Sequence, residues 1–162
     1  MYGDTAAMIL MLILAGASAA ATPDFDALRF FAGKTHGEGS FKSVLHARTD
    51  VHVDGSGRVE PDGTLILDQQ VRRGDKPVEP RQWRLRETSR GHYSGTLSDA
   101  RGAVEGDAVG NRLHLRFTST SGYRVEQWLE LASGGRQATN HLVARRFGIV
   151  VATLDETIVK AD

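Results

Sequence analysis

The chain has 162 residues, and its 20 Lys or Arg and 20 Asp or Glu side chains give a formal net charge of zero. This length predicts one domain, and the charge balance leaves no basic excess for nucleic acid and no run of Lys or Arg for an anionic membrane. The absence of cysteine excludes disulfides, thiolate nucleophiles and a lipoprotein anchored through cysteine.

An apolar segment lies close to the start of the chain. Residues 6–15 form an unbroken apolar run, and small residues follow it over 16–21. The run is shorter than the roughly 20 residues that span a bilayer, and it matches a signal-peptide core before an A-x-A cleavage site. We therefore expect a signal peptide over 1–21 and a mature domain over 22–162, without a transmembrane span, in the periplasm or outside the cell. A retained N-terminal anchor helix is the alternative, because Asp4 precedes the run and no Lys or Arg does.

One short helix is predicted after this leader. Residues 24–31 follow a proline, and Asp24 is placed to cap the first helical turn. Phe25, Leu28 and Phe31 recur at spacings of three, so they share one face of the helix. We expect this face to cover the open end of a sheet.

The chain after residue 33 alternates between apolar and polar side chains and is punctuated by glycine, which predicts short antiparallel strands. The expected strands are 40–46, 49–54, 64–72, 81–88, 93–98, 112–120, 123–131, 139–147 and 149–159. Turns are expected at Asp54-Gly55, Asp62-Gly63, Gly74-Asp75, Arg90-Gly91, Gly110-Asn111 and Gly134-Gly135. We predict an all-β fold, an antiparallel up-and-down barrel of 8–10 strands, because closure leaves no exposed sheet edge. A β-sandwich is the alternative.

No motif for metal binding or covalent catalysis is present in the sequence. The six histidines form no H-x-H, H-x-x-x-H or H-E-x-x-H pattern. The serines next to glycine do not form a G-x-S-x-G elbow, and the glycines form no phosphate-binding motif. We therefore predict no catalytic residues, no metal site and no cofactor.

Polar side chains interrupt the faces that alternation assigns to the interior of the barrel. Gln127 interrupts an apolar stripe, and Arg81 shares a face with Trp83. An unpaired buried polar group costs about 1–3 kcal/mol, so these groups either satisfy one another in a structural network or line a cavity and orient a ligand. The candidate ligand-binding residues are Arg81, Trp83, Tyr93, Phe117, Gln127 and Asn140. Trp128 lies on the face of its strand opposite to Val125 and Gln127. We expect it either to lie beneath the N-terminal helix or to contact a partner.

Several short motifs, taken in order, resemble a known family. They are FFAG at 30–33, GEGSF at 37–41, RQWRL at 81–85, YSGTLSD at 93–99 with Gly102, Gly106 and Gly110 after it, and Asn140 before RFGI at 146–149. Over residues 30–160 the chain resembles the proteobacterial family known as domain of unknown function 3833. The resemblance implies a lipocalin-like (calycin-type) barrel in the cell envelope, and it brings no assigned activity. Many members carry a lipoprotein cysteine, which this chain lacks.

Three functions are compatible with these observations. The first is a barrel that binds a small apolar or amphipathic ligand, such as a lipid. The second is a non-catalytic structural or interaction protein of the envelope with a filled barrel. The third is a barrel enzyme that uses Arg81 and Asp99, which requires these side chains to meet in one pocket. The volume and polarity of the barrel interior distinguish the three, whereas the sequence gives neither the identity of a ligand nor the oligomeric state.

Overall fold

The computed structural model describes residues 21–161. The predicted signal peptide therefore lies outside the described residues, apart from its last residue. Within this part of the chain one short helix precedes ten strands, and no helix is long and apolar enough to cross a membrane.

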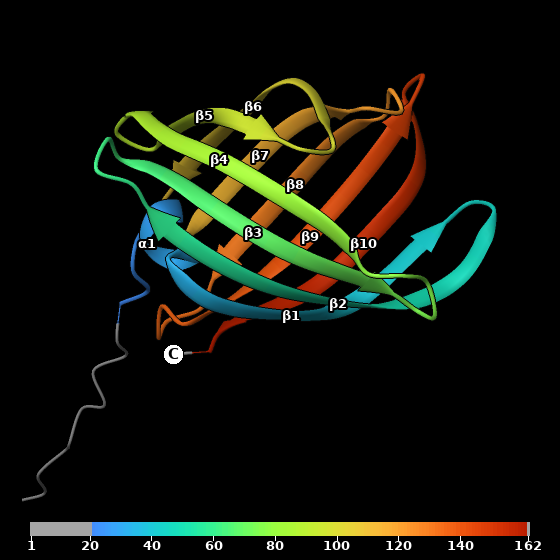
Figure 1. The fold of residues 1–162 in the computed structure, drawn as a ribbon, viewed down its shortest axis with the longest axis horizontal. Coiled ribbons are helices and arrows are strands. Elements are labelled where there is room, and N and C mark those ends of the chain that lie inside the picture. Colours follow the sequence, from blue (N-terminus) through green and yellow to red (C-terminus); the bar gives the residue numbers. More distant parts are fainter. Residues whose placement is uncertain (1–20, 162) are drawn as a thin grey trace, which may run out of the picture.

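The strands form one closed antiparallel barrel in which each strand pairs with its neighbours in sequence (Figure 1). The last strand pairs with the first, so the sheet has no free edge. The elements are α1 (Ala27–Phe31), β1 (Gly33–Ser43), β2 (His46–Val59), β3 (Thr64–Arg73), β4 (Glu79–Ser89), β5 (His92–Leu97), β6 (Ala100–Val109), β7 (Arg112–Ser119), β8 (Arg124–Leu131), β9 (Gln137–Arg146) and β10 (Ile149–Lys160). The predicted up-and-down barrel of 8–10 strands with a short N-terminal helix is confirmed, and the β-sandwich is wrong.

Because the strands alternate in direction, their turns gather at two ends of the barrel. The closed end holds α1 and the turns that follow β2, β4, β6 and β8, and the open end holds the turns that follow β1, β3, β5, β7 and β9 (Figure 1). The Phe25 amide donates to the Gly110 carbonyl at 2.7 Å. The Lys160 ammonium donates to the Phe30 and Ala32 carbonyls. These bonds hold α1 in place at the closed end, where it covers the barrel opening.

The helix begins later than the sequence predicts. It starts at Ala27 rather than at residue 24, and its cap is Asp26, whose carboxylate accepts a hydrogen bond from the Arg29 amide at 3.0 Å. The predicted cap, Asp24, is exposed. Both aspartates are suitable caps, and the difference follows from packing, because the shorter helix carries buried aromatic side chains at its entry and its end. These are Phe25, Phe30 and Phe31.

The first two strands also differ from the prediction. They meet at a turn of Val44 and Leu45, not at residues 47–48, and Asp54-Gly55 lies inside β2 instead of forming a turn. Gly55 pairs with Thr35, and a Cβ at position 55 would lie 2.4 Å from the Thr35 hydroxyl. The glycine therefore permits a close approach of two strands, and a turn is not needed to explain it.

Strand β6 was not predicted, because the expected strands leave residues 99–111 between them. Gly106 lies within β6 and is buried, and a Cβ there would be 2.8 Å from the Leu115 side chain. Small residues on this strand make room for the larger side chains of β7, which weakens the alternation that would have revealed the strand.

The inward-facing side chains form one apolar core, most of it in the half of the barrel that α1 closes. Leu65, Leu113 and Leu129 are almost fully buried there, together with the aromatic side chains of α1. The polar interior residues described below lie nearer the middle of the strands, so the core supports them from the closed side.

Candidate functional site

The barrel interior contains a cavity of about 120 Å³. Its walls are mostly apolar, with Phe31 toward the closed end and Phe41 toward the open end. The aliphatic lining residues are Val51, Val53, Leu67, Val71, Leu85, Leu115, Leu129, Leu142, Leu154 and Ile158, and the polar ones are Gln69, Arg73, Arg81, Gln127, Asn140 and Glu156. Apolar walls with a few convergent polar groups are the usual composition of a small-molecule site.

A pair of buried polar side chains lies on one wall of this cavity. Asn140 and Glu156 are register partners on β9 and β10, and Asn140 Nδ2 donates to Glu156 Oε2 at 3.0 Å. The carboxyl group fits because β1 has glycine opposite it: a Cβ at Gly37 would lie 2.0 Å from Glu156 Oε1. Asn140 Oδ1 is buried and has no hydrogen-bond partner within residues 21–161. The pair is therefore an incomplete network.

The environment of Glu156 favours its protonated form. Burial raises the pKa of this carboxyl above its ordinary value, although the hydrogen bond from Asn140 and the positive charge of Arg81 act in the opposite direction. A protonated carboxyl donates a hydrogen bond as well as accepting one. This wall thus offers an acceptor at Asn140 Oδ1 and, while Glu156 is protonated, a donor.

Two more polar contacts lie around β4. Trp83 Nε1 donates to Gln69 Oε1 at 2.8 Å, which satisfies the indole at the cavity wall. Arg81 Nε donates to Asp99 Oδ2 at 2.7 Å, near the open end. The contact that the enzyme hypothesis required therefore exists. Asp99 does not line the cavity, however, and its carboxylate is paired with the guanidinium, so the contact holds Arg81 at the mouth.

The structure brings four of the six predicted ligand-binding residues to the cavity, namely Arg81, Trp83, Gln127 and Asn140. Tyr93 is instead buried beside α1, where its hydroxyl accepts a hydrogen bond from the Ala27 amide at 3.3 Å. Phe117 packs edge-on against the Trp83 indole, with ring centroids 5.7 Å apart. Neither Tyr93 nor Phe117 lines the cavity.

Among the polar lining residues, Gln69, Arg73 and Glu156 were not predicted as ligand-binding, and Glu156 is the one of the three that is buried. A signal for it was present, because Ala152, Leu154 and Ile158 form an apolar stripe that Glu156 interrupts at the same spacing of two. This is the pattern that identified Gln127 on β8. The adjacent acidic residue, Asp155, lies on the opposite face of β10, as alternation requires.

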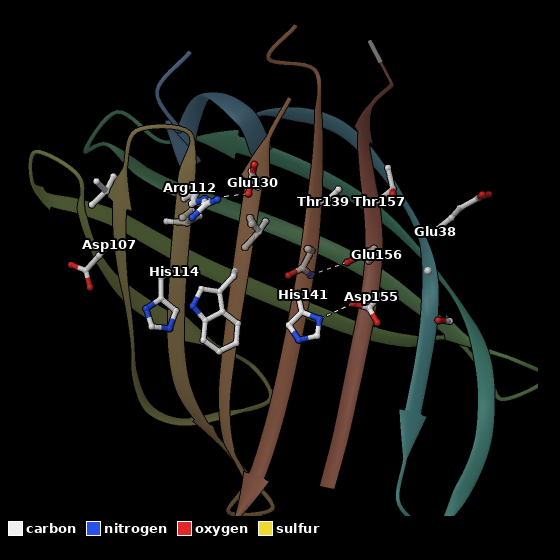
Figure 2. Close-up of a pocket in the computed structure, with 17 residues that line it drawn as sticks. Glu38, Asp107, Arg112, His114, Glu130, Thr139, His141, Asp155, Glu156 and Thr157 are labelled. Atoms are coloured by element: carbon white, nitrogen blue, oxygen red, sulfur yellow. Dashed lines mark hydrogen bonds and ion pairs between the residues drawn. The ribbon is translucent and has the colours of Figure 1, made fainter. Parts of the chain in front are cut away.

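A larger hollow, of about 980 Å³, lies on the outer face of the sheet (Figure 2). A row of register partners crosses it on β7 to β10: His114, Trp128, His141 and Asp155. The Trp128 ring stacks on His114, with centroids 4.9 Å apart and planes at 8°, and on His141 at 6.2 Å. His141 Nδ1 lies 2.6 Å from Asp155 Oδ1. Stacking and pairing of this kind stabilise neighbouring strands.

The outer groove offers less to a ligand than the interior does. Its ionisable groups pair with one another, as in the Arg112–Glu130 ion pair at 3.1 Å. Histidine rings lie beside the Trp128 indole on both neighbouring strands, with centroids 4.9 Å and 6.2 Å away, although the tryptophan is still 38% exposed. The helix α1 contacts β2 and β3, so Trp128 does not lie beneath it. Within residues 21–161 no group of His, Asp and Glu is arranged to hold a metal ion.

Comparisons with known proteins agree with this fold. The family model described as "Protein of unknown function (DUF3833)" matches residues 14–160. No curated protein matches the sequence. Among solved structures, the S-type phycobiliprotein lyase CPES from Guillardia theta is similar, with a TM-score of 0.63 over 83% of this chain and 90% of that chain, at 10% identity. At this identity the likeness shows the barrel fold alone.

Proposed function

We propose that this chain, which belongs to the DUF3833 family, is an exported barrel that holds one small amphipathic molecule in its interior. The observation that carries the proposal is the buried Asn140 side chain, which lines the cavity and whose Oδ1 has no partner within the described residues. An unsatisfied buried acceptor is destabilising, so its presence beside a cavity supports a bound molecule that supplies the missing donor.

The lining indicates the chemistry of the ligand. A hydroxyl or neutral amino group would donate to Asn140 Oδ1, and it would accept from the Glu156 carboxyl while that group is protonated. The rest of the buried part is apolar, because aliphatic side chains and the Trp83 indole form the walls. The cavity of about 120 Å³ is small, below the roughly 300–1,000 Å³ of drug-sized sites. The part of the ligand that enters the barrel is therefore only a few non-hydrogen atoms in size.

The small size of the cavity also favours a second candidate, a structural or interaction protein of the envelope whose barrel is filled. In that case the polar interior residues would serve the fold, and no molecule would enter. The two candidates differ in what they predict for the Asn140–Glu156 pair, because a purely structural pair should stabilise the empty barrel.

The location of the protein belongs to the same proposal. We infer that residues 1–21 are a signal peptide and that residues 22–162 act in the periplasm or outside the cell, because the apolar run over 6–15 is followed by small residues. N-terminal sequencing of the protein from a fractionated host should give a chain that begins close to residue 22. A full-length chain in the cytoplasmic fraction would contradict export.

Tryptophan fluorescence tests ligand binding, because the chain has only two tryptophans and one of them lines the cavity. In a Trp128→Phe variant, Trp83 alone reports on the interior. Titration with an organic extract of the host envelope, and with short-chain alcohols and amines, should change the Trp83 emission at saturating concentration.

The reverse variant is the matched control. In Trp83→Phe the remaining Trp128 lies on the outer face, so the same titration should leave its emission unchanged. An emission change that is equal in the two variants, or absent from both with every compound and extract, would contradict a ligand inside the barrel.

A further inference from the structure

The open end of the barrel carries exposed apolar side chains at the tips of its turns. Leu45, between β1 and β2, is 83% exposed, and Phe147, between β9 and β10, is 92% exposed. Val44, Ile149 and Val150 are exposed beside them. These five residues are called the apolar rim below. Apolar side chains gathered in this way mark an interaction surface.

The two turns of the apolar rim are neighbours around the open end. Their strands β1 and β10 pair with each other, and the Val44 amide donates to the Val151 carbonyl at 3.0 Å. A shallow groove next to the rim is lined by Lys42, Ser43 and Val44 on one side and by the start of β10, from Val150 to Thr153, on the other. Figure 1 shows both turns at the end of the barrel opposite α1, where the β1–β2 hairpin projects beyond the wall.

The backbone conformation at Phe147 is one that favours residue types other than phenylalanine. Phe147 and Gly148 have φ angles of 51° and 79°. This two-residue turn favours Asn-Gly or Asp-Gly, because an L side chain at positive φ is strained. The exposed Phe147 ring gains little burial in exchange for that strain. A phenylalanine here is explained better by a surface that receives its ring than by the stability of the barrel.

Positive charge surrounds the apolar rim. The turns of the open end, with the residues that flank them, carry nine Lys or Arg and only three Asp or Glu, in segments 42–48, 72–79, 98–101, 119–124 and 145–150. The Arg146 guanidinium lies 5.6 Å from the Tyr123 ring centroid and 5.4 Å from that of Phe147. Because the whole chain has zero net charge, this excess is a feature of one end and is offset elsewhere along the barrel.

We propose that the open end docks on the surface of an anionic lipid bilayer, with the apolar rim inserted at the boundary between headgroups and acyl chains. Apolar tips next to arginines suit such a surface, since the arginine stems pack against apolar groups while the guanidinium binds lipid phosphates. The rim side chains project from separate turns rather than forming one concave pocket, which favours a deformable lipid surface over a preformed protein site. The inference goes beyond the proposed ligand and does not rest on it.

Vesicle flotation tests the inference with residues 22–162, which contain every residue of the core cluster and omit the apolar leader that would bind lipid by itself. The protein should float with vesicles of phosphatidylcholine mixed with phosphatidylglycerol. It should float weakly with phosphatidylcholine alone, and high salt should reduce its flotation because the attraction is electrostatic.

Substitutions in the apolar rim have matched controls at the closed end. Leu45→Ser together with Phe147→Asn should reduce partitioning about tenfold or more, since two apolar side chains no longer leave water. Asn is favoured at this turn position, so the variant should fold at least as well as the parent. Val109→Ser is the control, because Val109 is 79% exposed at the closed end. Arg146→Gln should also weaken flotation, and Arg90→Gln at the closed end should not.

Two results would overturn the inference. One is the absence of flotation with the anionic vesicles. If a cross-linker at position 45 then captures an envelope protein, the apolar rim binds a protein instead of lipid. The other is an equal loss of flotation in the rim variant and in Val109→Ser. The Trp83 titration is a separate measurement, so failure of the ligand proposal leaves the vesicle result interpretable.

Discussion

Replacing the Asn140–Glu156 pair by leucine should make the empty barrel more stable. The double variant Asn140→Leu, Glu156→Leu removes the buried acceptor that has no partner in the described residues and a carboxyl group whose charged form burial disfavours. It keeps side chains of similar size in apolar walls, and the adjacent cavity gives them room to adjust.

The expected gain follows from the unsatisfied acceptor. A buried polar group without a partner costs about 1–3 kcal/mol, so the free energy of unfolding should rise by that amount. For a domain of this size the midpoint of thermal unfolding should rise by about 3–10 °C. Urea unfolding at pH 7, followed by tryptophan fluorescence, measures the change because both tryptophans remain in the variant.

The matched control lies on the same two strands. Thr139 and Thr157 are register partners that face outward, and their replacement by leucine should change stability by less than about 0.5 kcal/mol each. If the interior variant is instead less stable than the parent by 1 kcal/mol or more, the polar pair supports the fold. The reasoning that assigns it to a ligand would then be refuted.

Three further predictions concern the interior and the core. Above the ordinary glutamate pKa of 4.5 the unfolded state releases a proton that Glu156 retains in the folded state, so this group lowers the free energy of unfolding as the pH rises. Glu156→Gln should remove that decline. Urea midpoints that depend on pH in the same way in the parent and in this variant would contradict the prediction. Gly95→Ala should destabilise by about 1–3 kcal/mol, since its Cβ would lie 1.7 Å from a backbone oxygen, whereas Gly134→Ala meets nothing within 4 Å and should unfold at the parent's urea midpoint. Leu113→Ala should lower the free energy of unfolding by about 2–5 kcal/mol, because its side chain is fully buried; a loss below 1 kcal/mol would argue against a well-packed core.

The sequence predicts the barrel because the alternation is strong where both neighbours of a strand carry large side chains. On β8, Val125, Gln127, Leu129 and Leu131 are all buried, as a spacing of two requires. The same rule placed Arg81 and Trp83 on one inner face. Such strands can be predicted without knowledge of their partners.

The rule fails where glycine serves strand packing. Gly39 lies inside β1, and a Cβ there would be 2.1 Å from the Asp155 carbonyl oxygen on the neighbouring strand. Gly57 lies inside β2 with the Phe31 carbonyl oxygen 1.9 Å from the site of its Cβ. Glycine at these positions resembles a turn signal in the sequence. Its cause is the close approach of another backbone, which only the three-dimensional structure shows.

Only part of the site could be predicted, because alternation gives the face of each side chain but not its neighbours. Alternation assigns a side chain to the inner face, but it does not say which inner residues meet. Asn140 and Glu156 are 16 positions apart, and their contact depends on the register between β9 and β10. Likewise, the basic residues of the open end are spread over five turns, so a net charge of zero concealed their concentration at one end.

Native mass spectrometry of residues 22–162, purified gently from their own host, tests the central claim most directly. The account predicts a second species, heavier by the mass of one small organic molecule, for the parent protein. That species should be absent from the Asn140→Leu, Glu156→Leu variant and present in the Thr139→Leu, Thr157→Leu control. The polypeptide mass alone, in the parent as in the variants, would contradict a barrel that carries a ligand.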